Sequence, residues 1–152
     1  MNAIDVILAG FDEAYERKSW HGTNLRGALR RVDVKTALWR PAEGRHNIWE
    51  LAIHAAYWKY TVRRRLTGEK RGSFALKGSD WFASPDIADE SSWREVLDLL
   101  ENEHRLLRKT IESLPAKALD DRKTRHTLTG IAAHDLYHTG QIQLLRRLQG
   151  VF

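Results

Sequence analysis

Residues 47–66 read NIWELAIHAAYWKYTVRRRL, and the apolar side chains in this stretch recur at the spacing of one face of an α-helix. The stretch opens on Asn47-Ile-Trp-Glu50, which has the form of a capping box: asparagine caps the first turn and glutamate follows three residues later. Gly68 stands just beyond the last periodic residue, Leu66, where glycine commonly ends a helix. The stretch therefore predicts a long amphipathic helix with defined ends.

Three further segments carry the same helical period, and their apolar stripes cover residues 4–15, 92–114 and 127–148. We expect these helices to begin near Asn2, Ser92 and Thr127. No segment alternates as a β-strand does. The sequence therefore predicts an all-α fold, a four-helix bundle, made by residues 1–152 as a single domain.

The connections between the four helices differ in character. Short helical turns are expected at Leu25–Leu29 and Val34–Leu38. Residues 69–90 instead show no period, and a structureless connection of this length is often functional. It is long enough for the second and third helices to run parallel. Its aromatic residues suggest either a lid over a site or pins that hold the loop to the bundle, and they are Phe74, Trp81 and Phe82.

Composition excludes several classes of protein. The chain of 152 residues is 42% hydrophobic and 30% charged, which is typical of a globular domain and not of a disordered chain. It has no cysteine, which excludes disulfide scaffolds, thiolate zinc sites and cysteine nucleophiles. We find no signal peptide and no apolar stretch of the roughly 20 residues that cross a bilayer, so we expect a cytoplasmic protein without a membrane partner.

The net charge of +5 is unevenly distributed. Residues 59–71 hold six basic side chains against Glu69, whereas residues 86–104 hold seven acidic side chains against Arg94. A basic run of this kind is consistent with a non-enzymatic, stress-related bundle that binds nucleic acid or a protein partner. We favour a solvated helix face, because the run lacks aromatic interleaving and cations are stabilised at a helix C-terminus. Nucleic acid is therefore not the expected partner.

Three histidines fall on the apolar faces that should point into the bundle. His134 and His138 lie one helical turn apart, and His54 is in line with Leu51 and Trp58 on the helix of residues 47–66. An inward set of three imidazoles leaves one coordination position open for water or substrate, as in catalytic metal sites. Such a set suits Zn²⁺, Ni²⁺, Fe²⁺ or Cu²⁺. The other interpretation is three separately hydrogen-bonded core histidines.

Further candidate residues lie near these histidines in the sequence. Glu50 is either a general base or orienting group, or the second half of its capping box. Gln141 is expected to hydrogen-bond a metal ligand or substrate, or to be a core-edge amide. For Trp58 we favour packing over substrate stacking, and for Asp135 either a surface charge or a pair between helices.

The remaining histidines have weaker claims to the site. His104 lies on an apolar stripe and is expected to be structural, with a fourth ligand or proton shuttle as the alternatives. His21 opens the irregular segment after the first helix, where it is a candidate for the mouth of the site. His46 and His126 precede predicted helix starts and are expected to be helix-entry residues.

Two segments resemble a known family. Arg45-His-Asn-Ile-Trp-Glu-Leu-Ala-Ile-His54-Ala-Ala-Tyr-Trp58 and the downstream His134-Asp-Leu-Tyr-His138-Thr-Gly-Gln-Ile142 are similar to the DinB/YfiT-like superfamily of metal-dependent four-helix bundles. Gly78-Ser-Asp-Trp-Phe82 resembles a branch of that family. The resemblance implies an up-down-down-up topology and a metal held by His54, His134 and His138.

The resemblance also implies a reaction class and partners. Characterised relatives include thiol S-transferases and a thiol-dependent isomerase, others have been described as hydrolases, and many have no known reaction. One divalent ion, Zn²⁺ or Ni²⁺, would activate either a low-molecular-weight thiol cosubstrate or water toward a small-molecule substrate. Bundles of this kind commonly pair through a helix face, so we expect a homodimer, although no sequence patch identifies its surface.

Overall fold

The computed structural model describes residues 1–151, and this part of the chain contains helices and no strand. The long helices are α1 (Ala3–Tyr15), α4 (Ile48–Thr67), α5 (Glu90–Glu112) and α6 (Arg122–Leu148), and the short ones are α2 (Leu25–Leu29), α3 (Val34–Leu38) and the 3₁₀ turn η1 (Ala116–Asp120). The all-α prediction is confirmed. Each helix of residues 1–151 is too short or too polar to span a membrane.

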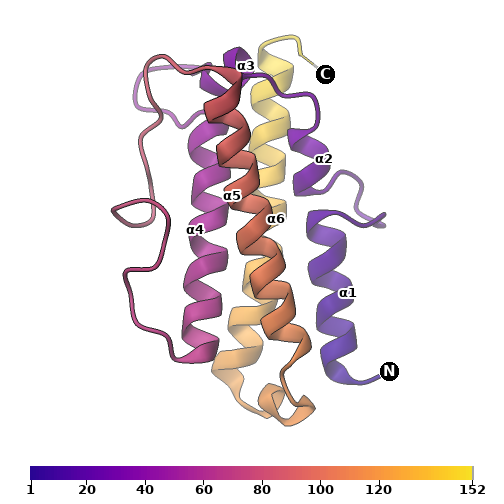
Figure 1. Ribbon diagram of the computed structural model, residues 1–152. Helices are drawn as coiled ribbons and strands as arrows, with labels where there is room; N and C mark the ends of the chain where they lie inside the picture. Colours follow the sequence, from indigo (N-terminus) through magenta and orange to yellow (C-terminus); the bar gives the residue numbers. More distant parts are fainter. Residues whose placement is uncertain (152) are drawn as a thin grey trace.

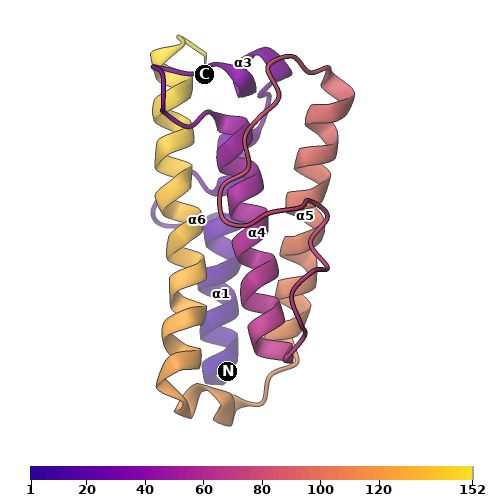
Figure 2. The ribbon, with the colours of Figure 1, turned by 90° about the vertical axis from the view of Figure 1, so that its left-hand side faces the viewer.

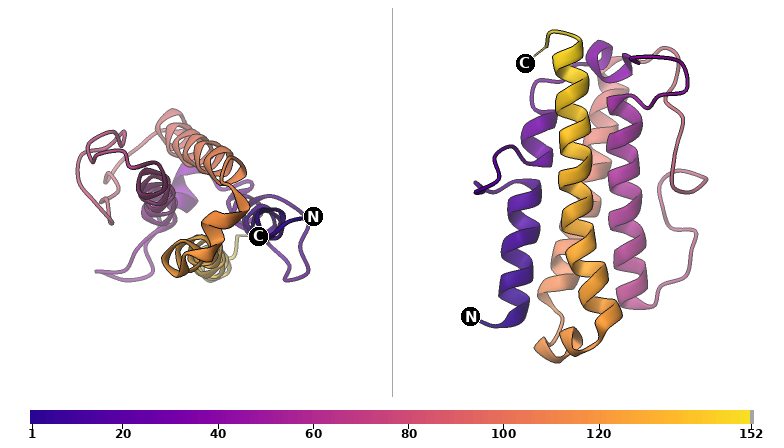
Figure 3. Two further views of the ribbon diagram at one scale, coloured as in Figure 1. Left: turned by 90° about the horizontal axis from the view of Figure 1, so that it is seen from below. Right: turned by 180° about the vertical axis from the view of Figure 1, so that it is seen from behind.

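The four long helices lie side by side (Figure 1). In that view α1 and α6 run upward along the chain, whereas α4 and α5 run downward. The loop of residues 69–90 joins the lower end of α4 to the upper end of α5 and lies along α4 on the side away from α1 (Figures 1 and 3). Figure 2 shows the same loop passing in front of α4, with α6 beside it.

The ends of α4 form as its sequence predicts. The Asn47 side chain accepts the backbone N–H of Glu50 at 2.9 Å, and the Glu50 carboxylate accepts the backbone N–H of Asn47, which completes the capping box. Gly68 ends the helix with a φ of 75°, a left-handed conformation that glycine adopts at little cost. This prediction is confirmed.

Two other helix starts were predicted too late. α5 begins at Glu90 because Asp89 accepts the backbone N–H of Ser92 at 2.8 Å. α6 begins at Arg122, and Asp121 caps it by accepting the backbone N–H of Thr124, also at 2.8 Å. The expected starts at Ser92 and Thr127 were wrong because the first turn of each helix is polar and gives no apolar period.

A fully buried ion pair joins α4 to α6. Lys59 Nζ lies 2.5 Å from Asp135 Oδ2, and both side chains are 0% exposed. The ammonium group also lies over the rings of Phe11 and Tyr15, at 4.9 and 5.1 Å from their centroids. Burial lowers the pKa of Lys59 and raises that of Asp135, while the close contact opposes both shifts. Asp135 is therefore the predicted pair between helices and not a surface charge, and Lys59 is not part of a solvated basic face.

His104 is packed between aromatic rings, as its structural interpretation predicts. Its ring stacks on Tyr15 with centroids 3.6 Å apart and on Phe11 at 4.6 Å. Neither ring nitrogen has a hydrogen-bond partner within residues 1–151, and burial keeps its pKa far below the usual value. The ring is held as a neutral core aromatic.

Candidate metal centre

Three imidazoles from α4 and α6 converge on one point. The Nε2 atoms of His54 and His134 lie 3.1 Å apart, and those of His138 and His134 lie 3.0 Å apart. His54 and His138 are buried and His134 is half-buried. The two helices therefore bring together residues that are 80 and 84 positions apart in the chain, as their inward-facing stripes predict.

Hydrogen bonds on the outer side of two rings fix which nitrogen faces the centre. His54 Nδ1 lies 2.9 Å from the backbone oxygen of Asp80, and His138 Nδ1 lies 2.6 Å from Gln141 Oε1. Because a carbonyl oxygen only accepts hydrogen bonds, Nδ1 carries the proton in both rings. Nε2 of each ring then directs a lone pair at the centre.

The arrangement fits a divalent ion. A proton on His134 Nε2 cannot give a full hydrogen bond to both facing lone pairs, whereas a cation satisfies all three nitrogens. Ligand nitrogens around tetrahedral zinc, at Zn–N distances of about 2.0–2.1 Å, lie about 3.3 Å apart. The separations of 3.0 and 3.1 Å are close to that value. The donor set and the spacing both suit a metal.

All three rings are neutral at physiological pH. Burial, followed by the charges of the neighbouring histidines, lowers the pKa of His134 to about 3. Burial also lowers the pKa of His138 to about 4 and that of His54 below its usual value. Neutral imidazole is the form that binds a metal, so the site needs no proton release from these rings near pH 7.

The loop of residues 69–90 is pinned against this site. The Trp81 indole lies between His46 and His54, stacking on them with centroid distances of 3.5 and 3.8 Å. Asp80 accepts the His54 proton through its backbone oxygen and the Trp58 indole N–H through its carboxylate, the latter at 2.9 Å. Asp80 adopts a left-handed φ of 63°, which is uncommon for a residue with a side chain. The pinning prediction is supported by these contacts, whereas opening and closing of the loop stays a prediction.

A model of the DinB superfamily matches residues 19–142. The chain belongs to the DinB superfamily. The matched range contains all three convergent histidines together with Asp80, Trp81 and Gln141. Comparison with curated proteins and with solved structures gives no match.

Glu50 of this DinB-superfamily chain is occupied by structural partners. Its carboxylate accepts hydrogen bonds from Arg40 at 2.7 and 3.1 Å and from the Ser84 backbone N–H at 3.0 Å. Burial favours a higher pKa for Glu50, but Arg40, the Ser84 amide and His46 together lower it to about 2. A carboxylate with so low a pKa is a weak base near pH 7. The capping role is confirmed, and the role of general base stays a prediction.

Of the other residues predicted to lie near the three histidines, two contact the cluster and one does not. Gln141 holds His138, and Trp58 presents an edge to His54 and His134 with ring centroids 6.4 and 6.3 Å away. His21 is exposed, and Ser19 is its one side-chain hydrogen-bond partner in the described part of the chain, so it does not join the cluster.

Two helix-entry predictions have different outcomes. His46 precedes α4 as expected and also stacks on Trp81. His126 lies inside α6, because that helix begins earlier than predicted, at Arg122.

Sequence reasoning missed Asp80 and the role of Trp81 against His54. The only signal was that Gly78-Ser-Asp-Trp-Phe82 resembles the family. Nothing in that motif specifies a backbone oxygen as the partner of a ring 26 residues earlier.

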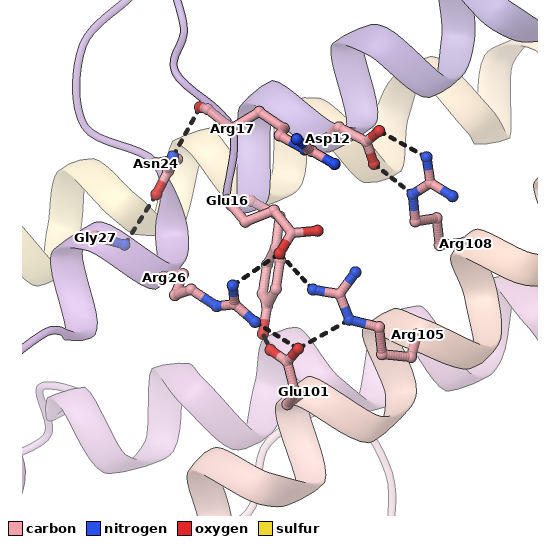
Figure 4. A network of polar contacts seen from close by, with 10 residues as sticks. Asp12, Glu16, Arg17, Asn24, Arg26, Gly27, Glu101, Arg105 and Arg108 are labelled. Atoms are coloured by element: carbon pink, nitrogen blue, oxygen red, sulfur yellow. Dashed lines mark hydrogen bonds and ion pairs between the residues drawn. The ribbon is translucent and has the colours of Figure 1, made fainter.

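A second group of three titratable side chains is less suited to a metal. Asp12, Glu16 and His104 also bring potential ligand atoms close together. Figure 4 shows why the carboxylates are occupied: Arg108 binds Asp12 through two bonds of 2.7 and 2.8 Å, and Glu16 pairs with Arg26 and Arg105. These arginines already neutralise the carboxylates. The group is an ion-pair network between α1, α2 and α5.

Proposed function

We propose that this DinB-superfamily protein is a metal-dependent enzyme. His54, His134 and His138 bind one divalent ion, Zn²⁺ or Ni²⁺, and leave one position open for a reacting group. The observation that carries this proposal is the convergence of three Nε2 atoms. In His54 and His138, the hydrogen bond made by Nδ1 leaves Nε2 unprotonated, so its lone pair is directed at the centre.

The reaction that we propose is attack of an activated thiol or water on a small electrophile. When bound, the ion supplies a Lewis acid that lowers the pKa of either nucleophile toward neutrality. Asp80 and Gln141 keep the rings of His54 and His138 in their binding orientation, and Trp81 shields one face of His54 from water. Because the chain has no cysteine, a reacting sulfur belongs to a low-molecular-weight thiol cosubstrate.

Our proposal extends to topology, assembly and location. The opposite directions of α1 and α6 relative to α4 and α5 support an up-down-down-up four-helix bundle (Figure 1). We further propose that the protein is cytoplasmic and forms a homodimer, because bundles of this kind commonly pair through a helix face.

The alternative of a nucleic-acid-binding bundle has lost support. Its basic segment, residues 59–71, contains Lys59, which is buried against Asp135. Arg63 is also engaged, by Glu103 at 3.2 Å and Glu69 at 3.1 Å. Two of the six positive charges are therefore neutralised by carboxylates, and the footprint for phosphates is weakened.

A turnover assay with matched metal states tests the proposal. Zinc- or nickel-loaded protein is mixed with a panel of thiols and the electrophile 1-chloro-2,4-dinitrobenzene, and with activated esters for hydrolysis. We expect turnover that disappears on chelation and returns on reloading. His21→Ala, an exposed histidine outside the cluster, is the control for ring loss. Turnover that is unchanged by chelation or by His54→Ala contradicts the proposal.

A further inference from the structure

A small pocket lies against the candidate metal centre. Its volume is about 210 Å³, and α4 and α6 line it from opposite sides with Trp58, Arg65, His126 and Gly130, up to the ring of His134. Pockets for drug-sized ligands have volumes of about 300–1,000 Å³, so this one suits a smaller molecule. In Figure 2 the two helices lie next to each other on the face turned toward the viewer.

The charged side chain in the lining is positive. The lining holds the Arg65 guanidinium and no acidic side chain. Arg65 is exposed and lies over the Trp58 ring, 5.8 Å from its centroid, and no ion pair is found for it among residues 1–151. Arg63, two positions earlier on the same helix, is paired with two glutamates. A guanidinium matches the geometry of a carboxylate, and His126 and Thr127 in the same lining add groups that form hydrogen bonds.

Gly130 is the one glycine in the lining of this pocket. It lies inside α6, one turn before His134, where glycine weakens a helix relative to alanine. A Cβ built on Gly130 would meet no atom within 4 Å, so packing does not require glycine. Gly130 is exposed and lines the pocket, so a larger side chain at this position would have room to extend over the pocket.

We propose that this pocket binds a thiol cosubstrate that carries a carboxylate. Arg65 binds the carboxylate, and the sulfur of the thiol lies toward His134. The inference rests on the proposed function, because it assumes that the histidines hold the ion to which the sulfur is directed. It adds a substrate class, a short thiol that carries a carboxylate, and a residue that selects it.

Calorimetric titration with two matched thiols tests the inference. The zinc content of the protein is measured first, and 3-mercaptopropionate is then compared with uncharged 3-mercapto-1-propanol. We expect the carboxylate to bind about fivefold tighter to wild type, as an exposed ion pair allows, and this preference to vanish in Arg65→Gln. Gly130→Val, which adds a bulkier side chain to the lining of the pocket, is expected to weaken both thiols at least tenfold while the zinc content and helical content are retained.

A neighbouring arginine provides the control. Arg64→Gln removes a positive charge next to Arg65 that lies outside this pocket, so it should keep the fivefold preference. Equal binding of both thiols to zinc-loaded wild type, or a preference that survives Arg65→Gln, overturns the inference alone. Failure to bind zinc overturns the proposed function and this inference with it.

Discussion

Breaking the buried pair of Lys59 and Asp135 should destabilise the protein severely. The substitution Lys59→Met keeps the length of the side chain and removes its charge. It leaves the Asp135 carboxylate without its one ion-pair partner among residues 1–151 and with both carboxylate oxygens shielded from water. Removing one member of a buried ion pair typically costs about 3–5 kcal/mol. Domains of this size are stable by about 5–15 kcal/mol, so the single variant loses a large share of its stability.

Replacing both members should restore most of that loss. In Lys59→Met/Asp135→Leu no uncompensated charge remains, and apolar replacement of a buried pair is often neutral or stabilising. We expect the double variant to be at least about 3 kcal/mol more stable than Lys59→Met. The pH gives a second signature: the unpaired Asp135 has a raised folded pKa, so the destabilisation of Lys59→Met should grow as pH rises above the unfolded pKa of about 3.9.

Urea unfolding followed by tryptophan fluorescence measures both effects. The chain has six tryptophans, which include Trp93 in the core. Lys70→Met, at an exposed position, is the matched control and should change stability by less than about 0.5 kcal/mol. A loss below about 1 kcal/mol in Lys59→Met, or a double variant no more stable than Lys59→Met, would show that Asp135 does not depend on Lys59 as a buried ion-pair partner.

Three further predictions concern the site. Gln141→Ala frees the His138 ring and should weaken zinc binding about 10- to 100-fold, measured by competition with a chromophoric chelator. An unchanged zinc affinity would contradict the role of Gln141 in orienting His138. Trp81→Ala should release the loop of residues 69–90, detected as faster limited proteolysis within it, and equal cleavage rates would show that Trp81 does not pin the loop. The melting temperature of metal-free protein should fall as pH drops from 7 to 4. The folded pKa values of His134 and His138 are about 3 and 4, below an unfolded value of about 6.5. The unfolded chain therefore binds more protons over this range, which favours unfolding. A melting temperature that is flat or rises over this range would contradict their burial as neutral rings.

The sequence predicted those features that depend on local pattern. The helix α4 has its cap at Asn47 and its end at Gly68 because both are decided within a few residues. The inward position of His54 follows from the same period, since a residue on the apolar stripe of an amphipathic helix faces the core. The convergence of His54 with His134 and His138 followed once two such helices were packed together.

Features that depend on contacts between distant segments escaped prediction. α4 is buried around most of its circumference, so Lys59 lies inside although its neighbours in the basic run suggest a solvated face. Asp80 was not foreseen because the loop of residues 69–90 has no period and its contact with His54 uses a backbone oxygen, which no residue type encodes. Asp89 is a residue type that commonly caps helices, so the start of α5 could have been predicted from the sequence. It was missed because the first turn of α5 is polar and shows no apolar period.

Elemental analysis shows whether His54, His134 and His138 together bind one divalent ion. The gently purified protein is analysed beside a His138→Ala variant prepared in the same way. We expect close to one equivalent of zinc or nickel in wild type and a loss of most of it in His138→Ala, with the helical content of both unchanged. A wild-type protein that carries no stoichiometric divalent metal and cannot be reloaded, or a variant that retains the full equivalent, would contradict this binding.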